Sequence, residues 1–241
     1  MKYITFLLFP LLFFSTQPET TDKPFVIVQL FTSQGCSSCP PADALVGKIK
    51  EEYKDQNVFV MSYHVDYWDR LGWKDPFSKR EFTEIQYRYA DQFRERQVYT
   101  PQIVVNGKEH FVGSDGSRLR RKIKNYLKKD AQNNIALSTQ KDAKGNLLVN
   151  YNISGELKGK KLKLALVLNK HTTQIKRGEN RNRTLTNSNV VLNELVLELG
   201  NKKSGSLTIP SSTLKEKGAI SIIGFVQNED LEITGANQTA I

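Results

Sequence analysis

Apolar residues form short blocks along the first half of the chain, and their spacing predicts alternating strands and helices. Residues 24–31 and 57–65 are apolar and rich in β-branched side chains, as buried strands are. Between them, the apolar residues of 42–53 recur at helical spacing, and a second helix is predicted over 78–93. Alternation of this kind is typical of an α/β fold.

A hairpin and a third helix complete the first half. Pro101 opens an apolar run that ends in Asn106-Gly107, a typical hairpin turn, and residues 109–112 form the returning strand. Residues 117–131 then predict an amphipathic helix, because their apolar side chains are spaced by four.

The second half of the chain has a different pattern. From about residue 134, short apolar or alternating stretches are separated by turn residues, and no long helical pattern occurs. This pattern predicts a small antiparallel β-sandwich over residues 134–241. Residues 177–183 are polar and predict a loop, which could lie over a site in the first half or simply join two strands.

The amino terminus indicates export. Met1 and Lys2 precede an aromatic and aliphatic run over residues 3–14, which is shorter than the about 20 residues of a membrane-spanning helix but fits a secretory signal. Small residues follow without an A-x-A pattern, so residues 1–17 are either a cleaved signal peptide or an uncleaved tether. We therefore expect a protein of the periplasm or cell envelope, where thiols can be oxidised.

The composition of the chain bears mainly on which partners to expect, because it is ordinary for a globular protein except for its positive net charge. The chain has 241 residues and a net charge of +10, and its hydrophobic fraction of 39% is ordinary for a globular protein. Basic and acidic residues balance in 1–120, so the excess lies in 121–241, among the predicted strands. Such scattered charge is typical of a solvated face or fits an anionic envelope surface. Together with export, it argues against nucleic acid as a partner.

The chain has two cysteines, and both lie in one motif between the first strand and the first helix, Cys36-Ser37-Ser38-Cys39. Two intervening residues let the sulfurs form a reversible disulfide, and the start of a helix stabilises the reactive thiolate. A passive structural disulfide is one alternative, although so small a loop removes little chain entropy. Metal binding is another, although a closed zinc site would need two further soft ligands.

Further candidate site residues follow the second strand. His64 and Asp66 are two positions apart, so their side chains share one face, and the carboxylate could orient the imidazole as a proton carrier for the thiols. His64 could equally be a core histidine that is hydrogen-bonded to a loop. Trp68 and Trp73 lie in the loop before the second helix, where they would form an aromatic rim for a polypeptide substrate or anchor the loop.

The order of elements and several motifs resemble the thioredoxin superfamily. The stretches FTSQGCSSCPPADAL, HVDYWDRLGWKDPF, YTPQIVVNG and GENRNRTLTNSNVV are similar to a family of secreted bacterial thioredoxin-like proteins that is catalogued as a domain of unknown function. The resemblance implies a thioredoxin-like domain over residues 24–132, with a helical insertion at about 66–95, followed by the β-sandwich domain.

The resemblance also implies roles for individual residues. In that superfamily a cis-proline preceded by threonine faces the cysteine pair, and Thr100 and Pro101 match this arrangement. The resemblance thus implies that Pro101 belongs to the catalytic site and presents its backbone to the bound chain, and that Thr100 contributes to substrate binding. By the same analogy Cys36 is the attacking thiol and Cys39 is the resolving thiol. The sequence departs from a standard thioredoxin at Gly35, where a tryptophan is usual, and in the two prolines after the second cysteine, which place the start of the regular helix near Pro40.

These observations lead to one main hypothesis and two alternatives. In the main hypothesis the protein is an exported thiol–disulfide oxidoreductase without a cofactor, in which Cys36 attacks the thiols or disulfides of envelope proteins and Cys39 resolves the product. A membrane-bound redox partner would restore its starting state. Alternatively, Cys36, Cys39 and His64 handle Cu(I) or zinc. In the third reading, the β domain is a binding or assembly module and the disulfide is inert.

Overall fold

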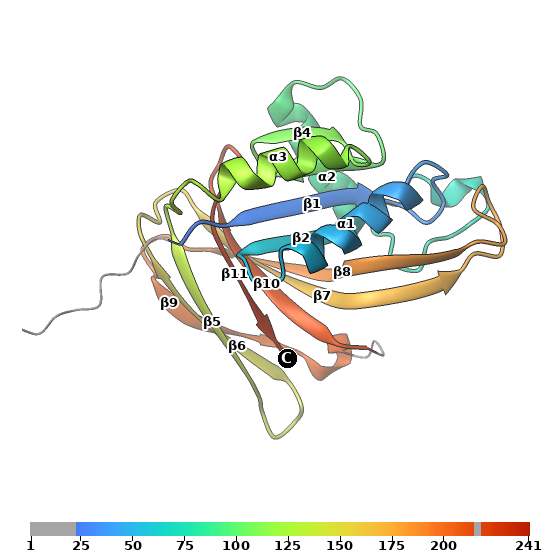
Figure 1. The fold of residues 1–241 in the computed structure, drawn as a ribbon. Helices are drawn as coiled ribbons and strands as arrows, with labels where there is room; N and C mark the ends of the chain where they lie inside the picture. Colours follow the sequence, from blue (N-terminus) through green and yellow to red (C-terminus); the bar gives the residue numbers. More distant parts are fainter. Residues whose placement is uncertain (1–22, 215–217) are drawn as a thin grey trace, which may run out of the picture.

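The computed structural model describes residues 23–214 and 218–241, and the predicted export signal over residues 1–17 lies outside these ranges. The described chain is a mixed α/β structure with one large and one small sheet (Figure 1). Its helical segments are α1 (Pro40–Glu52), η1 (Asp69–Leu71), α2 (Arg80–Phe93), α3 (Gly116–Tyr126) and η2 (Ser211–Leu214). Its strands are β1 (Val26–Thr32), β2 (Val58–His64), β3 (Gln102–Val105), β4 (Glu109–Val112), β5 (Asn134–Lys141), β6 (Leu147–Ser154), β7 (Lys161–Gln174), β8 (Thr184–Glu198), β9 (Ser204–Ile209), β10 (Ile220–Gln227) and β11 (Ile233–Ala240).

The large sheet contains strands from both halves of the chain. Its order is β11-β10-β7-β8-β2-β1-β3-β4, whereas β5, β6 and β9 form the small antiparallel sheet. In the described ladders, β2 and β8 join the two halves through the pair Ser62–Val190. The second half is therefore built of strands, as predicted, but four of these strands extend the sheet of the first half.

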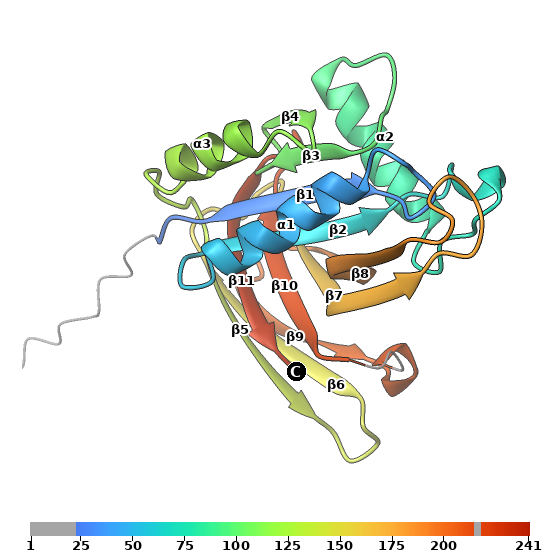
Figure 2. The same cartoon turned by 45° about the vertical axis from the view of Figure 1, so that its right-hand side comes forward.

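Alternation along β1 divides its side chains between two cores. Val26, Val28 and Leu30 pack with α1 and α3, which cover one face of β1 and β2 (Figure 2). Ile27 and Phe31 pack on the opposite face with α2. This second core also contains side chains from the second half, namely Ala165, Val167, Val191, Ile223, Phe225 and Ile233. Both halves of the chain therefore contribute to this core. The division into domains over 24–132 and 134–241 stays a prediction.

The helix boundaries follow local chemistry. α1 begins at Pro40, because a proline in the first turn lacks only an N–H that would have no helical partner. α3 begins after Asp115, whose side chain accepts a hydrogen bond from the N–H of Arg118. It ends at Tyr126, short of the predicted end at residue 131, because the chain turns there and the N–H of Lys129 donates to the carbonyl of Tyr126.

The turn between β3 and β4 contacts both halves of the chain, and a substitution in it tests that contact. Asn106 Oδ1 accepts from the N–H of Ile27 (2.6 Å), and the Asn106 carbonyl accepts from the N–H of Ile233 (2.9 Å). Gly107 has a φ of 68°, and a methyl group on it would overlap the carbonyl oxygen of Leu231. Gly107→Ala is expected to lower the free energy of unfolding by at least about 2 kcal/mol, measured by urea denaturation.

Gly200→Ala is the matched control for this contact. Gly200 also has a positive φ (52°), but no atom lies within 4 Å of an added methyl group. The control variant should lose only about 1 kcal/mol, from backbone strain. Equal losses in the two variants would contradict the close approach of Gly107 to Leu231.

Candidate functional site

The two cysteines form a disulfide in the turn between β1 and α1. Their Cα atoms are 5.4 Å apart, and Cys39 is the residue that caps the start of α1. The N–H of Cys36 donates to the carbonyl of Ser33 (3.1 Å), which closes the turn. Both cysteines are fully buried, whereas Ser37 and Ser38 between them are exposed. The turn therefore presents its serines to solvent and its sulfur atoms to the protein.

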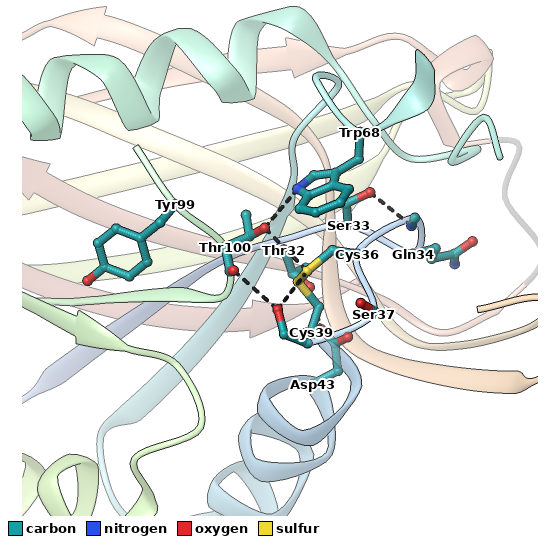
Figure 3. The surroundings of a disulfide bond; sticks show 12 residues. Thr32, Ser33, Gln34, Cys36, Ser37, Cys39, Asp43, Trp68, Tyr99 and Thr100 are labelled. Atoms are coloured by element: carbon teal, nitrogen blue, oxygen red, sulfur yellow. Dashed lines mark hydrogen bonds between the residues drawn. A yellow bond between two sulfur atoms is a disulfide. The ribbon is translucent and has the colours of Figure 1, made fainter. Parts of the chain in front are cut away.

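Hydroxyl groups surround the sulfur of Cys36 (Figure 3). Thr100 Oγ1 donates to Cys36 Sγ (3.3 Å), and Ser38 Oγ lies at the same distance. Trp68 Nε1 in turn donates to Thr100 Oγ1 (2.8 Å), and the Thr100–Pro101 peptide bond is cis. The structure thus brings Thr100 to Cys36, with Trp68 hydrogen-bonded to Thr100 and Pro101 next in the chain. Their catalytic and substrate-binding roles stay predictions.

Gln34 lies two residues before the disulfide, is fully buried, and is hydrogen-bonded on every side. Each of its polar groups has a partner in a distant segment. Its N–H donates to Asp75 Oδ2 (2.8 Å), its carbonyl accepts from Asn180 Nδ2 (3.0 Å), its side-chain amide donates to Thr173 Oγ1 (3.0 Å) and Asn187 Oδ1 (3.3 Å), and its side-chain oxygen accepts from Trp73 Nε1 (3.2 Å). Trp73 thus anchors the turn rather than touching the sulfur atoms.

The expected pairing of His64 with Asp66 is wrong, because the carboxylate that contacts the imidazole is Asp75. His64 Nδ1 lies 2.7 Å from Asp75 Oδ2, and both side chains are fully buried. Asp66 instead accepts a hydrogen bond from Thr83 Oγ1 of α2 (2.6 Å). The physical reason is that β2 ends at His64, so the alternation that would align the two side chains does not continue to Asp66.

Burial and neighbouring charges shift the pKa values of His64 and Asp75 in opposite directions. Burial lowers the pKa of His64, but the charge and hydrogen bond of Asp75 and the charge of Asp43 raise it above the usual value. Burial likewise raises the pKa of Asp75, but the His64 charge and hydrogen bonds from His64, Gln34 and Phe77 hold it below its usual range. The result favours a charged pair inside the protein.

Asp43 is a buried acid that the sequence analysis did not single out. It lies on α1 one turn after Cys39, and its Oδ1 accepts from Thr32 Oγ1 (3.0 Å). Burial raises its pKa to about 6, although the His64 charge and the hydrogen-bonding side chains of Thr32 and Asn187 oppose this. Among the described residues, His64 Nε2 is buried without a hydrogen-bond partner. The four-residue spacing from Cys39 was the signal that could have identified Asp43.

The polar loop at 177–183 lies over the cysteine turn, which decides between its two interpretations. Asn180 is fully buried, and its Nδ2 donates to the carbonyls of Gln34 (3.0 Å) and Cys36 (2.9 Å). Glu179 Oε2 accepts from the N–H of Ser37 (3.1 Å). The second half of the chain therefore holds the backbone of the candidate site in place.

The described ranges contain no group of three or more His, Cys, Asp and Glu side chains placed to hold a metal ion. Copper or zinc handling by Cys36, Cys39 and His64 stays a prediction, as does the reading of an inert disulfide. Of the helices within residues 23–214 and 218–241, none combines the length and the apolar character needed to cross a membrane.

The fold and the site define a mixed α/β protein with a buried C-x-x-C disulfide at a strand-to-helix turn. The sequence profile of a family described as proteins of unknown function, DUF1223, matches residues 27–227, so the chain belongs to this family. Among solved structures, it is similar to protein AGR_C_4864 from Agrobacterium tumefaciens, a structural-genomics target, with 26% identity and a TM-score of 0.67 over 88% of this chain and 92% of that chain. No curated protein sequence matches the chain.

Substitution of Asp43 should change how stability depends on pH. Since the folded state raises this pKa from 3.8 to about 6, the folded protein holds the proton more tightly than the unfolded chain. The stabilisation is complete below the unfolded pKa and is lost as the pH rises through about 6. Asp43→Asn should therefore gain about 2 kcal/mol relative to the parent protein between pH 4 and pH 8. Urea denaturation at both pH values measures this gain.

Asp55→Asn, at an exposed site, is the control. A difference in the free energy of unfolding between Asp43→Asn and the parent protein that does not depend on pH would contradict the assignment.

Substitution of Asn180 should loosen the turn that carries the disulfide. Asn180→Ala removes three hydrogen bonds, one of them from Arg183, and leaves the buried carbonyls of Gln34 and Cys36 without this donor. We expect unfolding to require about 2 kcal/mol less, and dithiothreitol to reduce the Cys36–Cys39 bond several-fold faster. Denaturant titration and thiol labelling followed by mass spectrometry measure the two effects. Arg181→Ala, an exposed position in the same loop, should change neither, and an unchanged reduction rate in Asn180→Ala would refute the positioning role.

Proposed function

We propose that this protein is an exported thiol–disulfide exchange protein whose residues 24–132 form a thioredoxin-like unit. The observation that carries the proposal is the contact between Cys36 Sγ and Thr100 Oγ1, next to a cis peptide bond at Pro101. The element order β1-α1-β2-α2-β3-β4-α3 and the position of the disulfide before α1 add support. Its substrates would be the thiols or disulfides of proteins in the periplasm or cell envelope.

The surroundings of the two sulfur atoms support Cys36 as the nucleophile. Cys36 Sγ has hydroxyl groups of Thr100 and Ser38 at 3.3 Å, and these can donate to a thiolate. Cys39 caps α1, so both sulfurs lie near the positive end of the helix. A thiolate stabilised in this way is a nucleophile at neutral pH and a good leaving group.

The exchange reaction conserves atoms and electrons in either direction. In the reducing direction, the Cys36 thiolate attacks a substrate disulfide, one substrate thiolate leaves, and a mixed disulfide forms. The Cys39 thiolate then attacks Cys36 Sγ, the second substrate thiolate leaves, and the Cys36–Cys39 disulfide forms. Two electrons pass from the cysteine pair to the substrate. The oxidising direction is the reverse, and a membrane-bound partner would restore the starting state of the pair.

In this proposal Asp43 exchanges a proton with Cys39. It lies one helical turn after this cysteine, and its pKa of about 6 lets it bind and release a proton near neutral pH. His64 and Asp75 then act on Asp43 through charge rather than on the sulfur atoms directly. This division of roles replaces the proton transfer by His64 and Asp66 that the sequence suggested.

Substrate access requires a local movement, because both cysteines are fully buried. Trp68 packs against Gly35, where a methyl group would lie 3.3 Å from its Cβ atom. The absence of a side chain at Gly35, where a thioredoxin has tryptophan, thus makes room for a tryptophan from the insertion. Displacement of Trp68, whose indole is hydrogen-bonded to Thr100, would expose Cys36 Sγ to a substrate.

Trapping of the mixed disulfide tests the proposal. The reduced protein is mixed with a peptide that contains one disulfide, and the products are followed by intact mass spectrometry. The parent protein should release both peptide thiols and become oxidised. Cys39→Ser should stop at a covalent adduct on Cys36, because the resolving thiol is absent.

Cys36→Ser, which keeps one cysteine in the same turn, is the matched control and should form no adduct at a comparable rate. Two results together would overturn the proposal: no adduct in Cys39→Ser, and reduction of the peptide by the parent protein no faster than by an equal concentration of dithiothreitol.

A further inference from the structure

A groove runs beside α1, on the side that faces β8. It encloses about 660 Å³, within the usual range of ligand sites. One wall is formed by α1 from Pro40 to Glu51, and the other by the beginning of β8, including Thr184, Leu185 and Thr186. Successive side chains of a strand point to opposite faces, so a groove lined by three consecutive residues runs along the edge of the strand.

The hydrogen-bond phase of the β7–β8 ladder shows which backbone groups face this edge. The N–H of Ile175 donates to the carbonyl of Arg183 (2.9 Å), so Arg183 directs its carbonyl toward β7. Because the direction alternates, the N–H and C=O groups of Thr184 and Thr186 point away from β7. Ser188 has the same phase, and its carbonyl accepts from Ser62 Oγ on that side.

The edge of β8 at Thr184 and Thr186 is therefore open. In the described ladders, β2 pairs with β8 at Val190 and not at these residues. The groove closes at Gly47, where an added methyl group would lie 3.1 Å from Ser188 Oγ. An edge with unpaired N–H and C=O groups is a template for an added strand.

Charged side chains around the groove favour an acidic occupant. Lys48, Lys170 and Arg183 line it and are exposed, and none has a carboxylate partner among the described residues. One exposed acid, Glu51, is also part of the lining. The rim thus carries an excess of positive charge toward solvent.

Asp43 also lines the groove, but it is almost completely buried, and the side chains of Thr32 and Asn187 face its carboxylate. The groove therefore offers an occupant the open edge of β8 and the cations of the rim. An extended peptide with acidic side chains fits both features, since its backbone can pair with β8 and its carboxylates can pair with the cations.

We propose that this groove binds an extended acidic peptide segment, which adds as a strand to the open edge of β8. This binding site goes beyond the proposed function and requires no redox chemistry. It would nevertheless hold the bound partner close to the disulfide, because Arg183 Nη1 donates to Asn180 Oδ1 (2.8 Å) and Asn180 Nδ2 donates to the carbonyl of Cys36.

Fluorescence anisotropy with the full chain tests the proposal. The probe is a short labelled peptide that alternates Glu and Val, and the comparison peptide carries Gln in place of Glu. The acidic probe should bind at least about fivefold more tightly than its Gln analogue, because it adds ion pairs at the rim. Lys48→Gln combined with Lys170→Gln should reverse most of this difference. Lys124→Gln combined with Lys128→Gln, which removes the same charge from α3 and the turn after it, should leave it unchanged.

A proline substitution tests the added strand separately from charge. Thr186→Pro removes an N–H that points into the groove, whereas Thr172→Pro removes one from the opposite edge of the same hairpin. Circular dichroism and thermal denaturation confirm folding of both variants. Thr186→Pro should weaken binding of the acidic probe, and Thr172→Pro should not. Equal binding of the Glu and Gln peptides would overturn the proposal. Equal losses of affinity in the two variants of each matched pair would overturn it as well. Neither result depends on thiol exchange.

Discussion

The structure around the disulfide depends on one requirement: a buried turn must have partners for all its polar groups. The backbone of Gln34 meets Asp75 and Asn180, and its side chain meets further donors and acceptors from β7, β8 and the loop before α2. An unpaired group in this position would cost about 1–3 kcal/mol. The turn that carries Cys36 can therefore be buried only when both halves of the chain are in place.

The same requirement links the large sheet to the chemistry of the site. Because β7 and β8 extend the sheet of the first half, their hairpin reaches the carboxyl end of β1 and places Asn180 over Cys36. Inside this enclosure Asp43, His64 and Asp75 interact strongly, since little water separates their charges. The enclosure of the site by the β7–β8 hairpin thus both buries the turn and raises the pKa of Asp43.

Much of the first half could be predicted from its sequence, because its strands and helices have strong local signals. The apolar blocks indicated β1 and β2, the Asn106-Gly107 turn indicated the β3–β4 hairpin, and the helical spacing indicated α1. The partner of His64 could not be predicted in this way. Asp75, which contacts His64, is eleven positions away across a loop. Asp69 shapes this loop, because its carboxylate accepts hydrogen bonds from the N–H of Asp75 and from Ser78 Oγ. No periodicity of a strand or helix therefore relates Asp75 to His64.

The sequence by itself determined that the two cysteines lie between a strand and a helix, since this follows from residue spacing. It also determined that strands fill the second half. Only the tertiary structure decided that four of those strands join the sheet of the first half and that the 177–183 loop covers the disulfide. The physical reason is the sequence distance over which the interactions act. Residue spacing indicates which face of its own helix or strand a side chain lies on. The burial of Gln34 and Asn180, in contrast, depends on a contact between segments more than a hundred residues apart.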